Sequence, residues 1–185
     1  MKAVCIATGP SLTQEDVDYC RGKAKIYAIK ESRYMAPWAD VLYAADHDWW
    51  DENSGCTDFA GEKWVCDERT AKKWGLHYIP YKVESPWSND RAYVATGGHS
   101  GFQAINLAAL HGASEIVLLG YDMGYSGNAK HWWTGKFKRN VRGSDYNDWI
   151  RRFYLALPHI KIPVYNASRF SYLNCFPKVN LKDVL

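Results

Sequence analysis

Apolar and polar positions follow two patterns that alternate along the chain. Unbroken apolar runs are typical of parallel strands covered on both faces, and they occur at 3–7, 41–45 and 116–119. Segment 25–29, which is apolar after Lys25, and segments 63–66, 78–79 and 162–165 predict further strands. Segments with helical spacing or cap residues predict helices at 13–22, 67–74, 100–112 and 144–157. This alternation predicts a single α/β domain over residues 1–185, with a doubly wound, mostly parallel sheet flanked by helices.

Residues 97–125 contain a glycine turn, a helix and a buried strand in succession. We expect Ser100 to be the helix N-cap and Gly112 to end the helix in the left-handed conformation. The strand that follows delivers Asp122 and Tyr125 to its C-terminal end. Ligands bind at that end in open α/β sheets, so we expect the site there.

The first strand runs directly into Thr8, Gly9, Pro10 and Ser11, and Thr13 then looks like a capped helix start. A strand, a glycine turn and a helix N-terminus together can hold a phosphate on backbone N–H groups. The turn is neither GxGxxG nor a P-loop, because it lacks their further glycines and lysine. Alone, it does not identify a ligand site.

Two further strands also end in polar residues. The strand predicted at 25–29 is followed by Lys30, and the strand predicted at 41–45 is followed by Asp46 and Asp48. Carboxylates at such a position bind a metal or a ribose hydroxyl, or they cap the helix that begins near Trp49. Capping is the commoner role of the two.

Residues 124–143 are polar and basic, without a regular period, and residues 81–91 also read as a loop. A loop as long as the first is usually functional or mobile. His131 lies within it, between Lys130 and Trp132. A loop histidine is often only an exposed side chain, although its ordinary pKa suits proton transfer.

Composition adds limits on function. The formal charge is +3 and the basic residues are scattered, so nucleic-acid binding is not indicated. The 9 Trp, 13 Tyr and 6 Phe are unusually many, and several fall in predicted loops. They fit stacking on sugars or bases, and equally the cover of a small core or a contact in a homo-oligomer.

The five cysteines are odd in number and never form CxxC, which argues against zinc and favours a reduced, cytoplasmic setting. No cleavable apolar segment follows Met1, and no apolar run reaches membrane-spanning length. We therefore expect neither export nor a membrane partner.

Three motifs stand in a characteristic order: TGPSL at 8–12, GGHSGFQAINLAALHGASEIVLLGYDM at 97–123, and GNAKH at 127–131. This order resembles the MptE-like family, typified by archaeal 6-hydroxymethylpterin diphosphokinases, and the bacterial CMP-sialic acid-dependent sialyltransferases. The resemblance spans most of the chain and implies a Rossmann-like nucleotide-binding fold. Two positions depart from it, because Thr8 and Lys30 or Glu31 stand where relatives have asparagine.

The resemblance also implies roles for individual residues. It places Asp122 against the substrate or a metal and makes His131 the general base. Lys130 and the basic residues 136, 138, 139 and 142 would neutralise a leaving phosphate. The nucleotide site implied in this way consists of Thr8, Gly9, Pro10, Ser11, Lys30, Asp46, Gly98, Ser100, Gly101 and Tyr121. The phosphate and acceptor contacts are Lys130, Tyr125 and Trp132.

Three functions remain open on the sequence. The first is a glycosyltransferase-like enzyme that uses a nucleotide-activated sugar, with His131 as base. The second is pyrophosphoryl transfer from ATP, with Mg²⁺ held by Asp122 and by Asp46 or Asp48. The third is a nucleotide-binding module without turnover.

Overall fold

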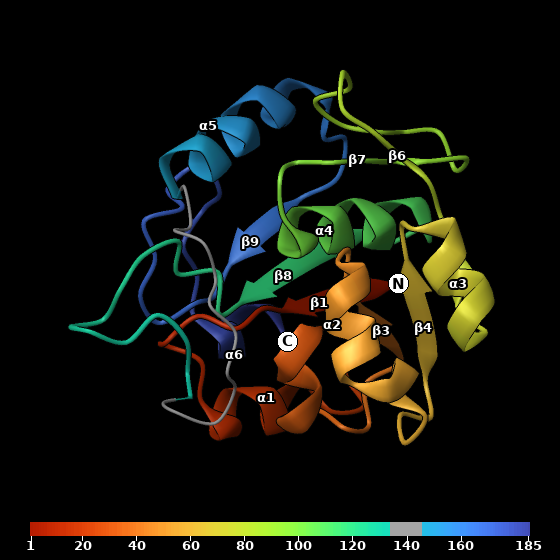
Figure 1. Ribbon diagram of the computed structural model, residues 1–185. Helices are drawn as coiled ribbons and strands as arrows, with labels where there is room; N and C mark the ends of the chain where they lie inside the picture. Colours follow the sequence, from red (N-terminus) through yellow and green to blue (C-terminus); the bar gives the residue numbers. More distant parts are fainter. Residues whose placement is uncertain (134–145) are drawn as a thin grey trace.

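The structure, a computed structural model, describes residues 1–133 and 146–185. Its centre is a parallel sheet of seven strands in the order β5-β4-β3-β2-β1-β8-β9 (Figure 1). The bounds of these strands are β1 Lys2–Ile6, β2 Lys25–Ile29, β3 Val41–Tyr43, β4 Glu62–Val65, β5 His77–Tyr78, β8 Glu115–Leu119 and β9 Val164–Asn166. The predicted α/β class with a parallel central sheet and flanking helices is thus confirmed.

The central strands are apolar on both faces because both faces are covered. Side chains alternate across a strand, so Cys5 of β1 faces one core while Val4 faces the other. In β8, Leu118 and Val117 are divided between the cores in the same way. This two-sided burial explains why the strands read as unbroken apolar runs in the sequence.

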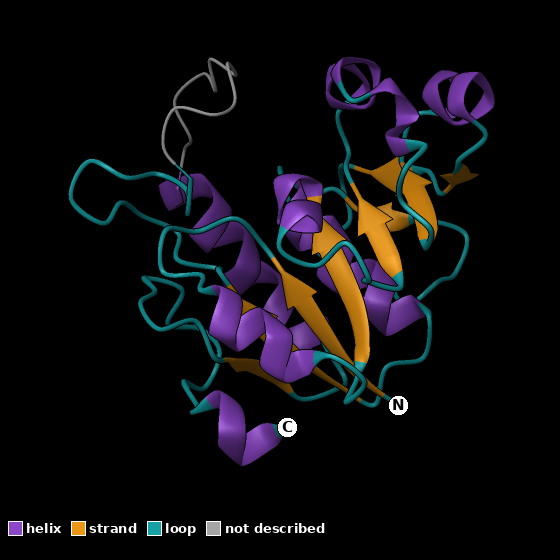
Figure 2. Cartoon of the chain, turned by 90° about the horizontal axis from the view of Figure 1, so that it is seen from below, coloured by secondary structure: helices purple, strands orange, loops and turns teal. Residues whose placement is uncertain are grey.

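Helices cover both faces of the sheet (Figure 2). Phe102 of α4 and Phe153 of α5 pack in one core, whereas Val17 of α1, Trp49 of α2 and Leu181 of α6 pack in the other. The bounds of the helices are α1 Gln14–Cys20, α2 His47–Glu52, α3 Glu68–Trp74, α4 Ser100–Leu110, α5 Tyr146–Ala156 and α6 Leu181–Val184. Short 3₁₀ helices in the described part of the chain are η1 Lys30–Tyr34, η2 Ser54–Cys56 and η3 Leu157–His159. No helix in the described ranges is long and apolar enough to cross a membrane.

Local signals account for most helix ends, with one correction. Thr13 caps α1 by accepting a hydrogen bond from the Asp16 N–H, and Gly112 has φ 87° after α4, both as expected. The N-cap of α4, however, is His99 and not Ser100. The extended backbone of His99 lets its ring Nδ1 accept from the Phe102 N–H at 3.3 Å. The predicted loop at 81–91 also contains β6 (Tyr81–Lys82), which pairs with β7 (Val94–Ala95).

Ser100 serves a different purpose from the capping role expected for it. Its Oγ accepts a hydrogen bond from the Ala45 N–H at 3.0 Å, just beyond the end of β3. The side chain is therefore directed across the sheet edge and not toward its own helix. This bond fixes the N-terminus of α4 against the loop that follows β3.

Candidate functional site

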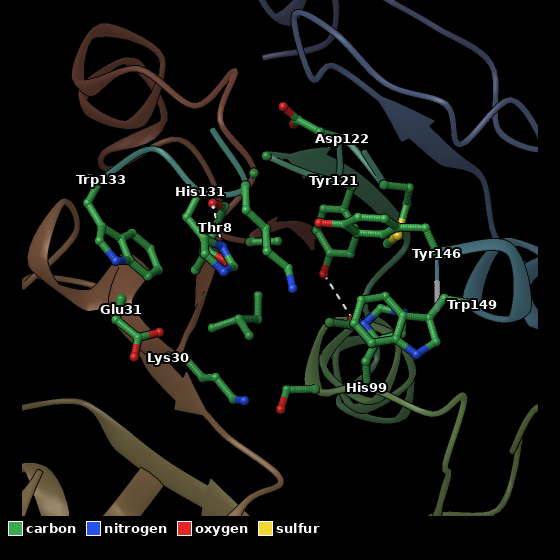
Figure 3. A pocket seen from close by; sticks show the side chains of 18 of the residues that line it. Thr8, Lys30, Glu31, His99, Tyr121, Asp122, His131, Trp133, Tyr146 and Trp149 are labelled. Carbon is green, nitrogen blue, oxygen red and sulfur yellow. Dashed lines mark hydrogen bonds between the residues drawn. The ribbon is translucent and has the colours of Figure 1, made fainter. Parts of the chain in front are cut away.

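A cavity of about 650 Å³ opens at the C-terminal ends of the central strands (Figure 3). It lies where β1 separates β2 from β8, so that the chain leaves β1 toward one half of the sheet and returns to its other side at β8. Such a switch point is the usual ligand site of an open α/β sheet. The expected site residues that line the cavity are Thr8, Gly9, Lys30, Asp46, Ser100, Gly101, Tyr121, Asp122, Lys130 and His131, and Asp48 lies among them.

Five expected site residues lie outside this lining. Pro10 and Ser11 follow Gly9 in the first turn but are not part of the lining, and Gly98 lies beside Trp149. Tyr125 borders a neighbouring groove, and Trp132 packs against the core that holds α1 and α2. The basic residues 136, 138, 139 and 142 lie outside the described residues.

Sequence reasoning assigned no role to several residues that do line the cavity. They are Glu31, His99, Trp133, Tyr146 and Trp149. Trp149 belongs to an amphipathic helix whose apolar face reads simply as a packing face. Trp133 follows Trp132 directly, and nothing in the sequence indicates which of the two turns toward the ligand side.

The first turn does not offer the free N–H groups expected of a phosphate loop. The Gly9 N–H donates to the Gly120 carbonyl at 2.8 Å, and the Leu12 N–H donates to the Gly9 carbonyl at 3.2 Å. Pro10 has no N–H at all. The turn is thus fastened to the end of β8, and most of its donors are used internally.

Asp122 completes this fastening. Its Oδ2 accepts from the Ser11 N–H at 2.6 Å, and its Oδ1 accepts from the Ser11 hydroxyl at 2.8 Å. The side chain is buried, which raises its pKa, while the two donors of Ser11 oppose that rise. A Cβ on Gly9 would lie 2.3 Å from Oδ1, so glycine permits this close approach.

Mg²⁺ does not fit these residues. Both oxygens of Asp122 already accept hydrogen bonds from Ser11. Among the described residues, no group of three or more His, Cys, Asp or Glu side chains could hold a metal ion.

His131 is held against the first turn by Thr8. Its Nδ1 lies 3.3 Å from the Thr8 carbonyl and 3.1 Å from the Thr8 hydroxyl, and its ring stacks on Trp133 at 4.5 Å. The Thr8 carbonyl can only accept, whereas the Thr8 hydroxyl can accept or donate, so a proton on Nδ1 is the assignment that satisfies both contacts. This assignment leaves Nε2 as the basic nitrogen. Burial, with smaller effects from Lys130 and Lys30, lowers the pKa of His131 against the opposing Thr8 bond.

His99 has the opposite tautomer. Because its Nδ1 accepts from the Phe102 N–H, its proton must lie on Nε2. Burial, followed by the charges of Lys30 and Arg152, lowers the pKa of His99 to about 3. The ring lies 4.7 Å from that of Trp149, and its buried Nε2 has no hydrogen-bond partner in the described part of the chain. His99 is therefore a neutral donor and not a base.

Positive groups and free N–H donors meet at the cavity. The first two N–H groups of α4, those of Ser100 and Gly101, have no partner recorded in the described ranges, and the dipole of this 11-residue helix favours an anion there. Lys30, with a left-handed backbone of φ 53°, pairs with Asp46 at 2.5 Å. Burial lowers the pKa of Lys130 on the cavity wall.

No protein-family model matches this sequence, and no curated protein sequence matches it significantly. Solved structures do resemble its fold. One is the MAf glycosyltransferase from Magnetospirillum magneticum AMB-1, with a TM-score of 0.69 and 12% identity over 98% of this chain. This chain spans only 34% of that protein's length.

A second structure is the sialyltransferase CstII from Campylobacter jejuni, in complex with a substrate analogue, cytidine-5'-monophosphate. Its TM-score is 0.50, with 13% identity over 96% of this chain and 84% of that one. At these identities the likeness shows a shared fold. Neither structure is a pterin diphosphokinase, so that part of the resemblance stays a prediction.

Proposed function

We propose that the cavity binds a nucleotide-activated sugar and that the protein is a glycosyltransferase with His131 as general base. The observation that carries this proposal is the bond between His131 Nδ1 and the Thr8 carbonyl. It leaves a basic Nε2 on a cavity-lining ring. The fold shared with the MAf glycosyltransferase and with the CMP-bound sialyltransferase supports the same reading.

The chemistry follows from the two sides of the cavity. Nε2 of His131 takes the proton of an acceptor hydroxyl as its oxygen bonds to the anomeric carbon of the donor sugar. The bond from that carbon to the phosphate oxygen breaks, and its electron pair leaves with the nucleotide. The N-terminus of α4, with Lys30 and Lys130, stabilises the negative charge that develops on the departing phosphate.

Binding is the first test. Thermal unfolding is measured with CMP, UMP, AMP and GMP and with the corresponding nucleosides, since a ligand raises the melting temperature when it binds the folded state. We expect at least one nucleotide to raise it more than its nucleoside does, because the α4 terminus and the lysines bind the phosphate. The proposal fails if none of the nucleotides binds.

Turnover is the second test, measured as nucleotide released from CMP-, UDP- and GDP-sugars. We expect His131→Asn to bind nucleotide like the wild type and to lose about 10²- to 10⁴-fold in kcat. The base must be neutral to act, and burial lowers its pKa, so kcat/KM should rise with pH along an acid limb whose midpoint lies below pH 6.5. His159→Asn, at an exposed histidine of η3, is the matched control. Full turnover by His131→Asn would exclude the assigned base.

A further inference from the structure

Glu31 is a buried carboxylate on the wall of the cavity. It follows Lys30 just beyond the end of β2, and only 8% of the residue is exposed. Figure 3 shows it among the side chains that surround the cavity. A carboxylate this buried is costly unless several donors satisfy it.

The protein orients Glu31 but supplies only part of its hydrogen bonding. Oε1 accepts from the indole N–H of Trp49 at 2.7 Å, and that indole is itself fully buried. The following turn is fixed by Ser32, whose hydroxyl donates to the Ile6 carbonyl at 2.7 Å. Within residues 1–133 and 146–185, no partner is recorded for Oε2. One oxygen is therefore fixed, and the other is an acceptor without a protein donor.

Two other acids at the cavity differ from Glu31. Asp46 pairs with Lys30, and its side chain is 45% exposed. Asp48 pairs with His47, and its side chain is 69% exposed. Water competes for both of these carboxylates, whereas the buried position of Glu31 makes a missing donor more costly.

The position of Glu31 identifies the donor that it would meet. In nucleotide-binding α/β sheets, phosphate lies at the switch point, and the ribose lies toward the end of the neighbouring strand that follows the first helix. Here that strand is β2, which is paired with β1 and reached from it through α1. A carboxylate at this place is suited to accept from a ribose hydroxyl.

We propose that Glu31 Oε2 accepts a hydrogen bond from a ribose hydroxyl of the bound nucleotide and makes the site selective for ribonucleotides. This inference rests on the nucleotide binding proposed above. It assigns a specificity role to Glu31 and not a part in the chemical step. Trp49 acts indirectly, as the positioning residue that holds the carboxylate.

Isothermal titration calorimetry tests the proposal with CMP, UMP, AMP and GMP and with the 2′-deoxy and 3′-deoxy form of each. We expect the wild type to bind the ribonucleotide about 10- to 100-fold more tightly than one of its deoxy forms, because the bound nucleotide covers Oε2 and that form gives it no donor. The deoxy form that loses affinity identifies the hydroxyl. Equal affinity for the ribonucleotide and both deoxy forms overturns the proposal, while nucleotide binding itself would stand.

The variant Glu31→Gln separates the role of the carboxylate from other causes of selectivity. Glutamine keeps the size and an oxygen for Trp49, but it places an amide NH₂ where Oε2 stands. We expect the ribose preference to fall to within about 3-fold, since the charged acceptor is lost. Glu68→Gln, which removes an exposed carboxylate on α3, should keep the preference.

Each result has a distinct meaning. A preference that persists in a folded Glu31→Gln variant, or one that disappears instead in Asp48→Asn, overturns the assignment to Glu31. If Glu31→Gln does not fold, the wild-type comparison of ribo and deoxy forms still decides whether the site reads the hydroxyl. If no nucleotide binds the wild type, the proposed function and this inference fail together.

Discussion

Acidification is a direct test of the environment of His99. Its ring is packed against Trp149 and Phe153 of α5, and burial, followed by the charges of Lys30 and Arg152, lowers its pKa to about 3. An unfolded chain binds the same proton at about pH 6.5. Between these two values the unfolded state is protonated and the folded state is not. The free energy of unfolding therefore falls as the pH falls.

The expected size follows from this pKa shift. Within the window, each pH unit removes about 1.4 kcal/mol of stability. From pH 6.5 to 5.0 the loss is roughly 2 kcal/mol, against a total stability of about 5–15 kcal/mol for a typical domain. At about pH 7.5 and above, both states hold a neutral imidazole, and His99 then contributes almost no pH dependence.

Urea unfolding at pH 7.5 and 5.0, for the wild type and His99→Asn, measures this contribution. Asparagine is a good N-cap, so its Oδ1 can replace Nδ1 as the acceptor for the Phe102 N–H without a group that titrates here. We expect the variant to lose about 2 kcal/mol less than the wild type between the two pH values.

His159→Asn, at an exposed position on η3, is the control substitution. His111 and His131, whose pKa values are also lowered, remain in both proteins and cancel in the comparison. Equal losses for the wild type and His99→Asn would refute a buried, neutral imidazole.

Two further predictions concern the attachment of the first turn to β8. Gly9→Ala should lower the free energy of unfolding by about 1–3 kcal/mol, because its Cβ would lie 2.3 Å from Asp122 Oδ1 and 2.5 Å from the Gly120 carbonyl. Denaturant unfolding measures this, and a change under about 0.5 kcal/mol would contradict the close packing. Ser11→Ala should raise the pKa of Asp122 further, since it removes the hydroxyl donor that lowers this pKa and keeps only the backbone N–H. Carboxyl ¹³C NMR follows that titration, and an unchanged pKa would show that the hydroxyl bond is not formed.

The fold was largely predictable because its signals are local. A strand buried on both faces requires an unbroken apolar run, and the ends of α1 and α3 carry their own cap residues. Thr13 and Asp67 accept from the N–H three residues on, and Gly75 takes the left-handed conformation. The prediction that Ser100 caps α4 was wrong because serine is a common N-cap in any sequence. Its Oγ instead accepts a hydrogen bond from the Ala45 N–H, 55 positions away, which the sequence does not indicate.

The site was less predictable because its contacts are not local. Asp122 lies 111 positions from Ser11, and the sequence cannot show that both carboxylate oxygens are already engaged. The Thr8 carbonyl that sets the tautomer of His131 is a backbone group, which leaves no trace in residue type. Sheet topology still brought most expected residues to one cavity, because parallel strands end at the same edge.

Protonation of His131 and protonation of His99 have different effects, so turnover and stability should depend on pH in different ways. Protonation of His131 removes the proposed base while the fold persists, whereas protonation of His99 opposes the fold itself. In His99→Asn the acid limb of turnover should therefore stay in place while the acid loss of stability shrinks. In His131→Asn turnover should be low at every pH, and the part of the acid loss that comes from His99 should remain. If His99→Asn shifts the pH at which turnover falls on the acid side, that fall is caused by unfolding of the protein. The pH profile would then give no support to His131 as the base.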